Sequence, residues 1–118
     1  MTEKPIYDLE ERTFQFAKAV RILVKTLPRS VSIIEDSRQL IRASGSVGAN
    51  YREANEALSR KDFLMRIRIS RKEAKESAYW LRLIRDTNEL ERINEVNELI
   101  REAEELTRIL SSIVLKSI

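Results

Sequence analysis

The sequence predicts an all-α fold, an antiparallel up-down four-helix bundle in which a single domain spans residues 1–118. Apolar residues make up 42% of the chain and charged residues 35%, a balance typical of long amphipathic helices. The chain has two glycines and two prolines, too few for the closely spaced turns of an all-β domain. Four polar side chains, each followed three residues later by a carboxylate, mark four expected helix starts.

The first helix is expected at about residues 9–26. Asp8 can accept a hydrogen bond from an unpaired backbone amide at its start, and Glu11 lies three residues further on. Pro28 ends this helix, because proline disfavours the helical conformation of the preceding residue. With successive residues about 100° apart, one face gathers the apolar residues Leu9, Phe16, Val20, Leu23, Val24 and Leu27.

The second helix is expected at about residues 33–57, where Ser32 and Glu35 form the same kind of capping pair. Because the loop from the first helix is short, these two helices should lie antiparallel. The expected core face of the second helix consists of Leu40, Ala43, Ser44, Val47, Tyr51, Ala54 and Leu58.

Two glycines lie inside this second helix, in the stretch IRASGSVGANYREANEA. A phosphate-binding loop would need them at a turn from a strand to a helix, and no strand is expected before them. Each glycine costs about 1 kcal/mol relative to alanine in a helix interior, so a close contact should offset that cost. We therefore expect Gly45, Gly48 and Ala49 to form a thin surface against which a neighbouring helix packs.

The third and fourth helices are expected at about residues 60–87 and 89–116. Ser59 with Asp62 marks the start of the third, and Asn88 with a carboxylate three residues later marks the start of the fourth. The apolar residues of the fourth helix alternate steps of three and four, which indicates a coiled-coil-like seam. They are Val96, Leu99, Ala103, Leu106, Leu110 and Ile113.

Charge is unevenly distributed along the second half of the chain. Residues 60–85 contain nine Lys or Arg and three Asp or Glu. Residues 86–105 contain two Lys or Arg and eight Asp or Glu. Six of the cations fall within about 100° of arc on the third helix, with Tyr79 among them. This basic stripe consists of Lys61, Arg68, Arg71, Lys72, Lys75 and Arg82.

The third helix also carries two apolar arcs, although a helix in a monomeric bundle needs one. The first arc consists of Phe63, Ile67, Ala74, Ala78 and Leu81. The second indicates a wide central helix or a subunit interface, where Trp and Met are favoured; its members are Met65, Ile69, Trp80 and Leu83. The charged residues between the arcs must pair if they are buried. The candidates are Arg66, Glu73 and Glu76, with Arg42 or Arg12 as partners on neighbouring helices.

The chain contains no cysteine and no histidine. The chain therefore lacks the residues required for disulfides, for thiolate or imidazole metal sites and for histidine-based catalysis. We expect no catalytic site, metal, cofactor or small-molecule substrate. The stretch MTEKPIYDLEER is charged and lacks an apolar run, and no apolar stretch is long enough to cross a bilayer, so we expect a cytoplasmic protein.

The chain resembles the bacterial four-helix bundle (S23-like) family named after the intervening-sequence proteins encoded within some 23S ribosomal RNA genes. The resemblance covers nearly the whole chain and rests on ERTFQFAKAV, QLIRASGSVGANYREANEALSRKDFLMRI and SRKEAKESAYWLRLI. It implies a ring-like homopentamer with a basic surface and an association with nucleic acid. The distantly similar accessory proteins of diversity-generating retroelements share this architecture and bind nucleic acid while assisting a reverse transcriptase. Ala54 stands where many relatives have glycine, which indicates a subgroup.

The sequence therefore predicts a non-enzymatic, oligomeric bundle that binds structured RNA or DNA through phosphate contacts of the basic stripe. The chain has no recognition-helix, finger or aromatic-platform motif, so base-specific recognition is not expected. Three alternatives stay open. The stripe is a solvated face neutralised by residues 86–105; it meets an acidic partner, which would make the protein an adaptor or scaffold; or the protein is a reverse-transcriptase accessory protein.

Overall fold

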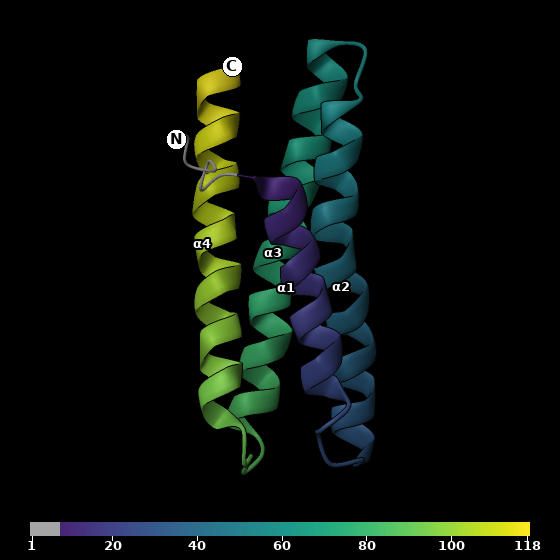
Figure 1. The fold of residues 1–118 in the computed structure, drawn as a ribbon, viewed down its shortest axis with the longest axis vertical. Coiled ribbons are helices and arrows are strands. Elements are labelled where there is room, and N and C mark those ends of the chain that lie inside the picture. Colours follow the sequence, from purple (N-terminus) through teal and green to yellow (C-terminus); the bar gives the residue numbers. More distant parts are fainter. Residues whose placement is uncertain (1–7) are drawn as a thin grey trace, which may run out of the picture.

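The computed structural model describes residues 8–118, which form α1 (Leu9–Val24), α2 (Val31–Asn55), α3 (Arg60–Asp86) and α4 (Ile93–Ser117). The helices run alternately up and down, joined by short loops (Figure 1). No strand occurs within this part of the chain. The predicted all-α four-helix bundle is confirmed.

Each helix packs against two others, and the order around the bundle follows the order along the chain. The α2–α3 pair is the most extensive, followed by α3–α4, while α1 packs against α2 and, over a smaller area, against α4. The backbones of the diagonal pairs, α1–α3 and α2–α4, do not approach each other closely. One side of α3 is therefore enclosed by α2 and α4, and its opposite side is turned outward.

Two of the predicted helix starts are confirmed by their hydrogen bonds. Oδ1 of Asp8 accepts from the backbone N–H of Glu11 at 3.2 Å, and α1 begins at the next residue. Oγ of Ser59 accepts from the backbone N–H of Asp62 at 3.0 Å and caps α3 in the same way. Each side chain satisfies an amide that has no partner inside its helix.

The predicted start of α2 at residue 33 is wrong, because Ser30 and not Ser32 is the capping residue. Ser30 has an extended backbone, and its Oγ accepts from the N–H of Ile33 at 3.2 Å. Ser32 already lies within the first turn of the helix. The helix also ends at Asn55, two residues before the expected end.

The predicted start of α4 is wrong as well, because Asn88 belongs to the end of α3. Its Nδ2 donates to the carbonyl of Ile84 at 3.0 Å, which satisfies one of the last carbonyls of α3. The first residue of α4 is Ile93, preceded by Arg92, whose side chain makes no capping hydrogen bond. Short polar side chains can cap either end of a helix, and the spacing does not distinguish the two.

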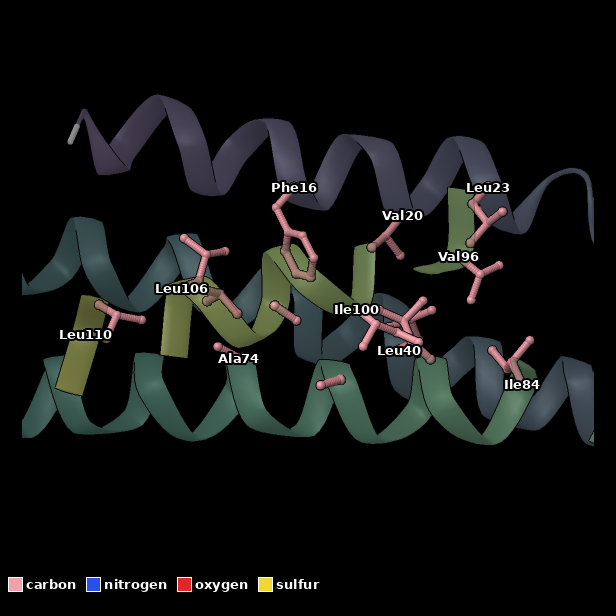
Figure 2. Packing of buried hydrophobic residues seen from close by; sticks show 14 of the residues in the cluster. Phe16, Val20, Leu23, Leu40, Ala74, Ile84, Val96, Ile100, Leu106 and Leu110 are labelled. Carbon is pink, nitrogen blue, oxygen red and sulfur yellow. The ribbon is translucent and has the colours of Figure 1, made fainter. Parts of the chain in front are cut away.

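The interior is filled by apolar side chains from all four helices. Figure 2 shows Phe16, Val20 and Leu23 pointing from α1 into this interior. Four residues of the predicted core faces are half-buried and pack against it: Val24, Tyr51, Leu99 and Ile113. Leu58 was predicted in the core but is fully exposed, because α2 ends before it and leaves it in the loop.

Candidate nucleic-acid interface

The basic stripe lies on the side of α3 that faces away from the core. The core side presents Ile67, Ala74, Leu81 and Ile84, all fully buried. Arg71 is half-buried, and the other five residues of the stripe are exposed: Lys61, Arg68, Lys72, Lys75 and Arg82. Because α3 is continuous through this region, the six cations follow one outward surface over about 32 Å of helix axis.

None of the six cations takes part in a salt bridge within residues 8–118. Four of the eight acidic residues in the segment that follows, residues 86–105, pair with other arginines. The pairs are Asp86 with Arg85, Glu95 with Arg92, Glu102 with Arg12, and Glu105 with Arg108. The acidic half of α4 therefore does not neutralise the stripe through salt bridges.

Asp86 is the acidic residue nearest in sequence to the end of the stripe. Nε of Arg85 donates to its Oδ1 at 2.7 Å, and this hydrogen bond is the main reason that the pKa of Asp86 lies below its ordinary value of 3.8. Desolvation opposes that shift, and the charge of Arg82 adds to it without a salt bridge. Arg82 thus remains available to a second anion.

Tyr79 is the aromatic residue of the stripe and is 55% exposed. Its ring stands nearly perpendicular to that of Trp80, at an interplanar angle of 80° and a centroid distance of 5.0 Å. Closer to the start of α3, a groove of about 570 Å³ runs along the stripe. The groove is lined by Ser59, Lys61, Asp62, Met65, Arg68, Ile69 and Lys72.

The second apolar arc lies along the edge of α3 that borders α2. Ile69, Glu76 and Leu83 are seven residues apart and share a helix face, and Oε1 of Glu76 lies 4.0 Å from Nη2 of Arg42 on α2. Met65 is exposed, whereas Ile69, Trp80 and Leu83 are half-buried. Nε1 of Trp80 is buried and donates no hydrogen bond to any residue that the structure describes.

The candidate ion-pair residues come together only in part. Arg42 and Glu76 are neighbours, but both side chains are exposed. Arg12 instead pairs with Glu102 of α4, donating from Nε at 2.7 Å and from Nη2 at 2.9 Å. Hydrogen bonding to Glu102 is the largest cause of the raised pKa of Arg12. Sequence reasoning missed Glu102, because no local spacing relates residues on the first and last helices.

Glu73 is buried, and it forms no salt bridge within residues 8–118. Its Oε1 accepts no hydrogen bond from the described residues. Arg66, which lies two turns earlier on the same helix, donates a hydrogen bond to Oδ1 of Asn50 at 3.0 Å and not to Glu73. An unpaired buried carboxylate oxygen is costly, which makes Glu73 a candidate for contact with a group outside this chain.

The two glycines of α2 differ in their surroundings. A Cβ at Gly48 would lie 2.8 Å from Oγ1 and 3.2 Å from Cβ of Thr13, so the backbones of α1 and α2 approach closely there. At Gly45 the nearest neighbour would be Nη2 of Arg21 at 3.1 Å, the end of a long side chain. Ala49 is exposed and lies outside this contact.

Residues 8–118 contain no group of three or more acidic side chains arranged to hold a metal ion. Within the same residues, no helix combines the length and apolar character that a membrane span requires.

These features define an all-α four-helix bundle with an outward basic stripe on its third helix. The chain belongs to the 23S rRNA-intervening sequence protein family, whose model matches residues 7–112. Its fold is similar to the crystal structure of a protein of unknown function from the S23 ribosomal protein family of Bacteroides thetaiotaomicron VPI-5482. The two chains are 33% identical, with a TM-score of 0.77 over 89% of this chain and 96% of the other. A search of curated proteins gives no match. The predicted family is therefore confirmed.

Proposed function

We propose that this protein is a non-enzymatic, oligomeric bundle that binds structured RNA or DNA through the basic stripe of α3. The observation that carries the proposal is that six cations share one outward surface and make no salt bridge within residues 8–118. Unpaired cations on a rigid helix can each neutralise a phosphate and release a condensed counterion.

A homopentamer, expected from the family resemblance, would repeat the stripe around a ring and strengthen weak phosphate contacts through effective concentration. Support for a subunit contact comes from the edge of α3 that borders α2, where Met65 is exposed and Nε1 of Trp80 has no acceptor within residues 8–118. The unpaired Oε1 of Glu73 lies on the same side of the helix. Light scattering should give a mass of several chains, and Ile69→Glu should reduce it to one chain.

The proposal is tested by binding of a labelled structured RNA and a matched DNA duplex across a salt series. The wild type should bind with micromolar or better affinity at low salt and with a steep salt dependence. In Arg71→Glu/Lys75→Glu/Arg82→Glu binding should be lost, while the circular dichroism spectrum and oligomer mass stay unchanged.

A matched control changes the net charge by the same amount elsewhere. Lys18, Arg29 and Arg101 are exposed, lie outside the stripe and make no salt bridge within residues 8–118. Lys18→Glu/Arg29→Glu/Arg101→Glu should retain most of the affinity. Equal loss in both triple variants would mean that net charge alone attracts the nucleic acid. Absence of binding by the wild type at low salt would overturn the proposal and favour an acidic protein partner for the stripe.

A further inference from the structure

We infer that the stripe binds unpaired nucleotides, with the ring of Tyr79 as the platform on which a base stacks. This inference rests on the proposed nucleic-acid binding and names the part of a structured nucleic acid that the site takes: a loop, bulge or single strand. The observation that carries it is an exposed aromatic ring that contacts Trp80 and lies between the cations Lys75 and Arg82 of the stripe.

Cations surround Tyr79 along the helix. Lys75 lies one turn before it, Lys72 two turns before it and Arg82 about one turn after it, all on the same face. From Arg68 to Arg82 the helix axis spans about 21 Å, the length of about six stacked nucleotides at their spacing in a helix. A backbone that follows these cations passes directly beside the phenol ring.

The ring of Tyr79 is held in place but not covered. The perpendicular contact with Trp80, at a centroid distance of 5.0 Å, restricts its rotation, and 55% of the residue stays exposed. Trp80 is itself half-buried and packs against the core. A ring restrained before binding loses little conformational freedom when a base stacks on it.

A perfect duplex cannot use such a ring along its length, because its bases are already stacked on one another and present only edges in the grooves. Unpaired bases expose their faces, and surfaces that bind single strands combine a cationic track with aromatic platforms of this kind. The stripe should therefore prefer unpaired over fully paired nucleic acid of the same length and charge.

The test compares a labelled twelve-nucleotide (about two site lengths) single-stranded RNA with the duplex of the same sequence, for wild type, Tyr79→Phe and Tyr79→Leu. Tyr79→Leu should weaken single-strand binding about tenfold, the loss expected when one base can no longer stack on an aromatic ring. The same variant should change duplex binding by less than about twofold. Tyr79→Phe keeps an aromatic ring and should retain the affinity. Because Tyr79 is exposed, both variants should keep the melting temperature and oligomer mass of the wild type.

The fluorescence of Trp80 gives an independent readout, since it is the only tryptophan of the chain and contacts Tyr79. Its emission should change on addition of the single strand and much less with the duplex. Equal affinity for the two nucleic acids, or equal effects of Tyr79→Leu on both, would overturn the inference while leaving the proposed function intact. If neither nucleic acid binds even at low salt, the proposed function itself fails, and the inference fails with it.

Discussion

Gly48→Ala tests the close approach of α1 and α2 with the smallest possible perturbation. The new Cβ would lie 2.8 Å from Oγ1 and 3.2 Å from Cβ of Thr13. Thr13 cannot turn aside, because its side chain is fully buried and its hydroxyl donates to the carbonyl of Leu9 at 2.6 Å. The backbone of α1 must therefore move outward by several tenths of an ångström (about the shortfall from normal contact).

Two effects of opposite sign decide the result. Overpacking of this kind costs about 1–3 kcal/mol, and alanine recovers about 1 kcal/mol through its higher helix propensity. The net expectation is a loss of about 1 kcal/mol in the free energy of unfolding, or about 4 °C in Tm. Gly48→Leu places three more carbons at the contact and should disrupt folding or assembly. Urea denaturation monitored by circular dichroism measures the first effect, and the oligomer mass measures the second.

Gly45→Ala is the matched control, three residues earlier on the same helix. Its Cβ would approach only Nη2 of Arg21, at the end of an exposed side chain that can move away. Helix propensity should then dominate and raise the free energy of unfolding by about 0.5–1 kcal/mol. If Gly48→Ala were as stabilising as Gly45→Ala, or if Gly48→Leu left the spectrum, Tm and oligomer mass unchanged, the argument for close packing would be refuted.

Three further predictions concern charged side chains. A double-mutant cycle of Arg12→Ala and Glu102→Ala should give a coupling of about 1 kcal/mol, because the pair is bidentate and partly buried; additive effects in urea denaturation would contradict it. Asp86→Asn should lower the free energy of unfolding at pH values above 3.8, the ordinary pKa of an aspartate. The difference from the wild type should vanish as the pH falls through the depressed pKa of Asp86 in the folded protein, and a difference independent of pH would exclude this linkage. Glu73→Met should lower the free energy of unfolding of the assembled protein by about 1–3 kcal/mol, since the buried Oε1, which accepts no hydrogen bond within residues 8–118, is expected to meet a donor of a neighbouring subunit; a higher Tm would show that this oxygen has no partner in the assembly.

The helices could be predicted because apolar periodicity is summed over many residues, and their alternating direction because the loops between them are short. Phe16, Val20 and Leu23 each contribute to the same face, so an error at one position does not change the result. Helix ends depend on one backbone conformation, which is why Ser30 caps α2 where Ser32 was expected. The prediction that Leu58 lies in the core is wrong for the same reason, because α2 ends at Asn55, two residues before its expected end, and Leu58 then lies in the loop.

The outward position of the stripe could also be predicted, because a continuous helix fixes the angle of every side chain around its axis. Contacts between side chains of different helices could not be predicted. The sequence offers Arg42 or Arg12 as partners of the α3 carboxylates, but the partner of Arg12 is Glu102, 90 residues away in the sequence. That choice depends on how α1 sits between α2 and α4, which periodicity within a helix does not determine. The perpendicular contact of Tyr79 with Trp80 likewise required side-chain geometry.

The order of helices around the bundle also sets the order in which it can form. Contacts between α1 and α2, α2 and α3, and α3 and α4 each close a short loop at little entropic cost, and folds dominated by such contacts form in microseconds to milliseconds. The contact between α1 and α4 joins the two extremes of the described chain, so the bidentate pair of Arg12 and Glu102 should form late. Loss of this pair should therefore accelerate unfolding and leave the refolding rate almost unchanged.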